Sequence, residues 1–138
     1  ADLWADEYYR AAALLDDPEA QLIFAKRQLS LARFWQSFSD SSMALELHQQ
    51  YAHQYLKQAF DYLDKAFENN YSQAKRFYGL IYINGWGVET DKNKGYQYIM
   101  DSIEEQGEWQ KANEIFKQLG LKQSELLQNM MTKKQQQR

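Results

Sequence analysis

The sequence predicts an all-α fold, a short right-handed α-solenoid of helix-turn-helix repeats with about two repeats, capping helices and one elongated helical hairpin. Two observations come from composition. One proline and six glycines in 138 residues favour long helices over a turn-rich β fold. A hydrophobic fraction of 44% is sufficient for a packed core. The third observation is a helical segment that recurs along the chain.

The recurring segment occupies residues 5–20, 59–74 and 95–112. Each copy has a tyrosine three positions after its first residue, then apolar residues at helical spacing, a stop signal and an alanine. The tyrosines are Tyr8, Tyr62 and Tyr98, and the alanines are Ala20, Ala74 and Ala112. A second helix follows each alanine. We call the helix after the alanine A-type and the recurring segment B-type.

These patterns predict a series of helices. A B-type helix is expected over residues 2–15, an A-type helix over 18–38 and a long helix over 42–68. The next A-type helix covers 72–84 and its B-type partner covers 92–105. A final run begins at Glu108 and breaks near Gly120, before a terminal helix over 124–131.

We interpret the chain as one repeat domain over residues 1–132. It consists of a partial repeat at 5–20, a degenerate repeat with an inserted hairpin at 20–73, a well-matched repeat at 74–111 and capping helices at 112–132. Residues 133–138 form a flexible tail.

A Gly-Trp-Gly-Val turn joins the helices expected at 72–84 and 92–105. Gly85 and Gly87 can adopt positive φ without steric cost, Val88 folds back as an apolar plug, and Asp91 caps the next helix. A phosphate-binding loop would require a preceding strand and a third glycine, and position 90 is Thr. We therefore expect a structural turn.

The segment from Ala74 resembles a Sel-one-like repeat, a relative of the tetratricopeptide repeat. Eight positions match the family pattern: Ala74, Gly79, Tyr82, Gly85, Gly87, Val88, Asp91 and Lys94. Gly95 departs from the usual alanine. The preceding copy resembles the family through Lys65-Ala66, with Asn70 in place of a glycine. The resemblance implies an adaptor or scaffold, including in envelope and secretion assemblies.

Residues that could carry chemistry are few. The chain has no cysteine. His48 and His53 are five residues apart, whereas paired metal ligands on a helix need a spacing of three or four. The acidic pairs Asp61/Asp64 and Glu104/Glu105 are interpreted as solvated charge. We expect no catalytic residue, cofactor or metal.

The net charge of −3 and the absence of a basic block disfavour a nucleic-acid partner. No apolar run reaches the ~18 residues that a membrane span needs. Because the chain begins with Ala1 rather than Met, we expect a periplasmic or exported protein, with a cytoplasmic location as the alternative.

Most aromatic residues recur at helical spacing and are expected in the core. These are Tyr8, Tyr9, Phe24, Phe34, Trp35, Phe60, Tyr62, Phe67, Phe77, Tyr78 and Tyr82. Trp86 in the turn and Trp35, Tyr51 and Tyr55 in the inserted hairpin are in addition candidates for partner contact. On the A-type helices, the candidate groove residues are Lys26, Arg33, Arg76, Leu80 and Ile83.

The function we expect is therefore that of a non-catalytic adaptor that binds a protein or peptide partner through the solenoid surface. One alternative, from some relatives of the resembled family, is binding or hydrolysis of cell-wall-type small molecules. The other is a homo-oligomeric structural module that associates through the inserted hairpin.

Overall fold

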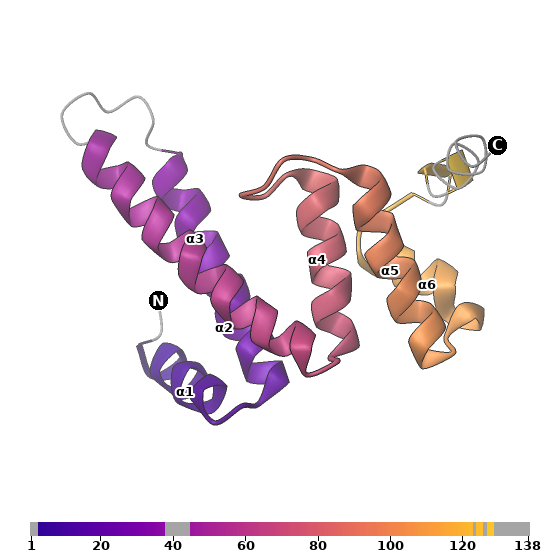
Figure 1. Cartoon of the computed structure of the whole chain (residues 1–138), viewed down its shortest axis with the longest axis horizontal. Helices are drawn as coiled ribbons and strands as arrows, with labels where there is room; N and C mark the ends of the chain where they lie inside the picture. Colours follow the sequence, from indigo (N-terminus) through magenta and orange to yellow (C-terminus); the bar gives the residue numbers. More distant parts are fainter. Residues whose placement is uncertain (1–2, 38–44, 123, 126, 129–138) are drawn as a thin grey trace. The chain divides into compact units, whose positions relative to one another are not determined.

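The computed structural model describes residues 3–37, 45–122, 124–125 and 127–128 (Figure 1). The helices are α1 (Leu3–Leu14), α2 (Pro18–Gln36), α3 (Leu45–Glu68), α4 (Ser72–Asn84), α5 (Lys92–Gln106), the 3-10 helix η1 (Trp109–Lys111) and α6 (Ala112–Gln118). No strand occurs among the described residues, so the all-α prediction is confirmed there.

The helix bounds agree closely with those predicted, and α4 agrees at both ends. Within the predicted terminal helix, residues 124, 125, 127 and 128 are helical. The rest of that helix, the predicted tail at 133–138 and the predicted start of the long helix at 42–44 lie outside the described residues. None of the helices described is long and apolar enough to cross a membrane.

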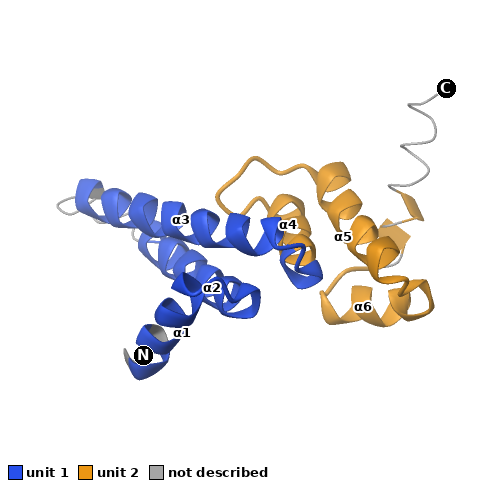
Figure 2. Cartoon of the chain, turned by 60° about the horizontal axis from the view of Figure 1, so that its bottom comes forward, with its two compact units in different colours: residues 1–74 blue, residues 75–138 orange. Residues whose placement is uncertain are grey.

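The chain divides into two compact units, residues 1–74 and 75–138 (Figure 2). The first contains α1, α2 and α3, and its centre is the α2–α3 hairpin. Asp17 accepts a hydrogen bond from the amide of Glu19 at 3.1 Å, and Pro18 occupies the first helical turn, so α2 begins at a well-capped position.

Small side chains line the hairpin. Ala25, Ala32, Ala52 and Ala59 are all buried, and they recur on the two helices at intervals close to whole helical turns. Alanine at such positions allows two helices to pack closely. Leu22, Leu29 and Leu63 are buried as well, so large apolar side chains pack beside the small ones.

A buried amide network joins the end of α1, the start of α2 and the residue that follows α3. Gln21 is fully buried, and its Nε2 donates to the Ala13 carbonyl and to Asp16 Oδ1, each at 3.2 Å. Its Oε1 accepts from Asn69 Nδ2 at 3.3 Å. Because both ends of the buried amide are hydrogen-bonded, its burial carries no desolvation penalty for an unmet polar group.

The second unit depends on a close approach of α4 and α5. A Cβ atom at Gly79 would lie 2.6 Å from the carbonyl oxygen of Gly95, and one at Gly95 would lie 2.5 Å from the carbonyl oxygen of Gly79. The backbones of the two helices are therefore in contact at these glycines. The adjoining core consists of Ile83, Tyr96, Ile99, Ile103, Ile115 and Phe116.

The Gly-Trp-Gly-Val turn has the geometry that the sequence predicts. Gly85 and Gly87 have φ of 70° and 75°, and Asp91 accepts a hydrogen bond from the Lys94 amide at 3.1 Å. The B-type helices also end alike, since Asp16, Asn70 and Gly107 all adopt positive φ. Each predicted stop signal thus contains a left-handed residue.

Two aromatic residues predicted in the core lie at the surface. Tyr8 and Phe34 are 68% and 53% exposed. Their spacing is helical, but the face on which they lie is not covered by another described element. Phe24 does lie in the core, where its ring meets that of Tyr62 at 4.7 Å.

Candidate functional site

Aromatic side chains gather where the end of α2 faces the start of α3. The Trp35 ring lies 5.0 Å from that of Tyr51 and 5.3 Å from that of His48, and Phe34 packs edge-on against Trp35 at 5.5 Å. We call these four residues the hairpin aromatic cluster. Tyr51 is 37% exposed and Phe34 is 53% exposed, so part of the cluster is open to solvent.

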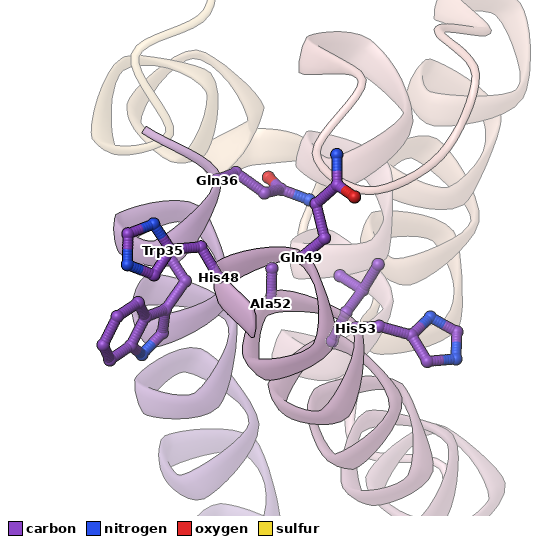
Figure 3. Close-up of a pocket in the computed structure, with 7 residues that line it drawn as sticks. Trp35, Gln36, His48, Gln49, Ala52 and His53 are labelled. Atoms are coloured by element: carbon purple, nitrogen blue, oxygen red, sulfur yellow. The ribbon is translucent and has the colours of Figure 1, made fainter. Parts of the chain in front are cut away.

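A pocket of about 260 Å³ lies beside the cluster (Figure 3). The lining residues are Trp35, Gln36, His48, Gln49, Ala52, His53 and Leu56. This volume is slightly below the ~300–1,000 Å³ of typical small-molecule sites. Apolar and amide groups dominate the lining, and the described lining residues include no carboxylate.

The two histidines of the pocket do not converge. Figure 3 shows His48 on the side of Trp35 and His53 pointing away from it on the other side of the helix. This agrees with their spacing of five residues. Among the described residues, no group of three or more histidine or acidic side chains could hold a metal ion.

A second pocket of about 320 Å³ lies farther along the hairpin, between α1, α2 and α3. The residues that line it are Glu7, Arg10, Phe24, Gln28, Leu31, Tyr51, Gln54, Tyr55 and Gln58. Tyr51 belongs to both features, because its ring contacts Trp35 and it lines this second pocket. The contact between Trp35 and Tyr51 thus joins one lining residue of each pocket.

Three glutamines, together with Glu7 and Arg10, give the second pocket its polar character. Gln28 donates from Nε2 to Gln58 Oε1 at 2.5 Å, which fixes the orientation of both side chains. A primary amide has both donors and an acceptor, and so does the backbone of a bound peptide. Tyr51 and Tyr55 supply rings beside these amides. The lining suits an extended peptide with apolar side chains.

Three candidates from the sequence are brought together here, namely Trp35, Tyr51 and Tyr55. Lys26 and Arg33, also on α2, are exposed. Sequence analysis considered His48 only as a metal ligand, and it did not identify the glutamines as site residues. The spacing of four residues between Tyr51 and Tyr55, and between Gln54 and Gln58, contained the available signal.

The candidates in the second unit are more deeply engaged. Ile83 lies in the core cluster, where it is not available to a partner. Arg76 donates to Ser102 Oγ at 3.0 Å and pairs with Glu108 at 3.1 Å. Leu80 and Trp86 are half-buried, and the Trp86 ring lies 6.2 Å from that of Phe77.

Comparison with known proteins gives no relative: no family model, curated protein or solved structure matches the chain.

Proposed function

We propose that this chain is a non-catalytic interaction module that binds an extended segment of a partner protein along the α2–α3 hairpin. The observation that supports it is the contact of Trp35 with Tyr51, which joins the hairpin aromatic cluster to the amide-lined second pocket. Binding energy between proteins concentrates at aromatic side chains such as these, which are partly exposed before the partner binds.

The proposal includes the repeat architecture. The matching ends of the B-type helices at Asp16, Asn70 and Gly107 support a solenoid of Sel-one-like type. So does the small-residue contact at Gly79 and Gly95. In such an architecture the elongated hairpin extends beyond what the stacking of repeats requires.

A small-molecule or hydrolase-like function has weaker support. The first pocket contains imidazole groups, but its described lining residues offer no carboxylate to orient or activate them, and the two imidazoles point apart. An open pocket bordered by exposed aromatic side chains fits a peptide better than a reacting substrate.

The test is affinity capture with the full chain, followed by titration of the recovered partner. Trp35→Ala with Tyr51→Ala should weaken binding by a factor on the order of 10–100, because both rings lie at the centre of the proposed surface. Trp109→Ala is the matched control, since Trp109 is exposed and lies in the other unit. Equal affinity of the double variant, the control and the unaltered chain would rule out this surface.

A further inference from the structure

Helix α1 presents a second apolar surface that the hairpin site does not use. Trp4 and Tyr8 of α1 are 86% and 68% exposed, and Leu15, the residue after the end of the helix, is 83% exposed. Their spacings of four and seven residues place all three on one face. The adjoining face, with Tyr9, Ala12 and Ala13, packs against Ala20 and Phe24. Half of a broad apolar arc is thus open to solvent, and in Figure 2 α1 lies at the margin of the first unit.

The A-type helix α2 and the B-type helix α3 show how such a face is normally covered. Three contacts join them: Asn69 Nδ2 to Gln21 Oε1 at 3.3 Å, the Tyr62 ring to the Phe24 ring at 4.7 Å, and Gln58 Oε1 to Gln28 Nε2 at 2.5 Å. On α3 the contacting positions are one residue before, three after and ten after Ala59.

The helices α4 and α5 repeat this register. The same positions, counted from Gly95, are Lys94, Tyr98 and Glu105. Each contacts α4: Lys94 lies over the Tyr82 ring at 4.5 Å, Tyr98 lies 5.8 Å from Tyr78, and Glu105 pairs with Lys75. The chemistry differs between the two pairs, but the three positions serve the same purpose in both.

Counted from Ala5, the same positions of α1 are Trp4, Tyr8 and Leu15. The exposed face of α1 is therefore the face with which α3 and α5 hold their A-type helices. Two of its residues are also apolar where the other copies are polar: Trp4 corresponds to Gln58 and Lys94, and Leu15 corresponds to Asn69 and Glu105. Such a face favours an apolar occupant.

Acidic residues next to this face indicate what kind of partner it can bind. Glu7, Asp16 and Asp17 are exposed beside it. Burial, together with the negative charges of Glu19 and Asp17, raises the pKa of Tyr71 nearby. A negative border repels an anionic lipid surface and attracts basic residues.

We propose that α1 binds an amphipathic helix of a partner protein, antiparallel to α1, in the position that an A-type helix occupies on α3 and α5. The bound helix carries apolar residues at positions i, i+3 and i+7. These positions correspond to the first, fourth and eighth residues after Ala20 and Ala74, with which α2 and α4 contact their B-type helices. A small residue at i+4 corresponds to Ala25 and Gly79 and faces Ala5. Basic residues flank this apolar stripe.

The probe is a fluorescein-labelled synthetic peptide of about 18 residues, long enough for several helical turns. It has leucine at i, i+3 and i+7, alanine at i+4, and lysine and glutamine elsewhere. A scrambled peptide of the same composition controls for charge. Fluorescence anisotropy with the full chain should give a Kd on the order of 10–100 µM, because the surface is small.

The decisive variant is Trp4→Gln with Leu15→Asn, which installs the residues of α3 at the same positions. Both side chains are exposed, and circular dichroism should show an unchanged helix content. Peptide affinity should fall at least about tenfold. The control Trp109→Gln and the hairpin variant Trp35→Ala/Tyr51→Ala should bind the peptide like the unaltered chain, which separates this proposal from the hairpin site.

Three kinds of result would overturn the proposal. One is equal affinity of the unaltered chain for the designed and scrambled peptides, or equal affinity of the Trp4→Gln/Leu15→Asn variant and the unaltered chain for the designed peptide. Another is a dimer in light scattering that the variant dissociates while no peptide binds, which would make a second copy the occupant. The third is binding to anionic phosphatidylserine vesicles that the variant loses, again without peptide binding.

Discussion

Glycines and alanines determine how closely the helices approach each other, residue by residue. The positive φ of Gly85 and Gly87 could be predicted, because a turn between two helices with that spacing needs residues that tolerate it. The requirement for glycine at position 95 could not. It arises from the Gly79 carbonyl on another helix, which a one-dimensional pattern does not reveal.

Gly95→Ala tests this requirement. Alanine has a higher helix propensity than glycine by about 1 kcal/mol, so an unconstrained site would be stabilised. Here the new Cβ would meet the backbone oxygen of Gly79 at 2.5 Å, which cannot move independently of α4. We expect a net loss of about 1–3 kcal/mol in the free energy of unfolding, measured by urea denaturation. Gly107→Ser is a comparison without a clash, since nothing lies within 4 Å of its missing Cβ; only the φ of 64° is strained there, at a cost of about 1–2 kcal/mol. A stabilised Gly95→Ala would show that the helices are farther apart.

Tyr96 gives a prediction for alkaline pH. Its side chain is buried and its hydroxyl donates to Glu125 Oε2 at 3.0 Å. Burial and this hydrogen bond raise the pKa of Tyr96 to about 12. The neutral phenol is therefore favoured in the folded state, and its contribution is complete below the ordinary pKa of ~10 and is lost as pH rises towards 12. Stability measured by urea denaturation should fall between pH 10 and 12, and Tyr96→Phe should reduce that fall. An unchanged pH dependence in the variant would contradict the assignment.

Among the elements, the α2–α3 hairpin shows most clearly what the sequence reveals. Its helix bounds follow from local signals such as the Asp17 cap and Pro18, and they were predicted within a few residues where both ends are described. The exposure of Tyr8 and Phe34 was not, because helical spacing identifies a face but not whether another helix covers it. The candidate pockets depend on contacts between elements, so only their aromatic residues were identified.

Enlarging an alanine of the hairpin tests the packing of this element. Ala32 is fully buried on α2, so Ala32→Leu should force the two helices apart and cost about 1–3 kcal/mol of unfolding free energy. Ala11→Leu adds the same atoms at an exposed position of α1 and should change stability by less than about 0.5 kcal/mol. Thermal or urea denaturation of both variants measures the difference. Equal effects would mean that Ala32 does not lie in a tight helix contact.

For the molecule as a whole, the same three positions make the contacts between α2 and α3 and between α4 and α5. The proposal for α1 is based on this recurrence. The repeat could be recognised because its stop residues and small residues lie at fixed positions. The sequence did not predict which surfaces remain exposed to solvent. Exposure depends on particular residues, such as Trp4 and Leu15 at α1. The hairpin aromatic cluster and the α1 face are consequently two separate proposals for binding surfaces.

Amide hydrogen exchange of the full chain, alone and saturated with the partner recovered by capture, tests the hairpin proposal most directly. Binding along the hairpin should slow exchange in peptides covering residues 45–58 and 24–37, where the cluster and both pockets lie. Unchanged exchange in both segments, with slowing confined to residues 75–122, would contradict it.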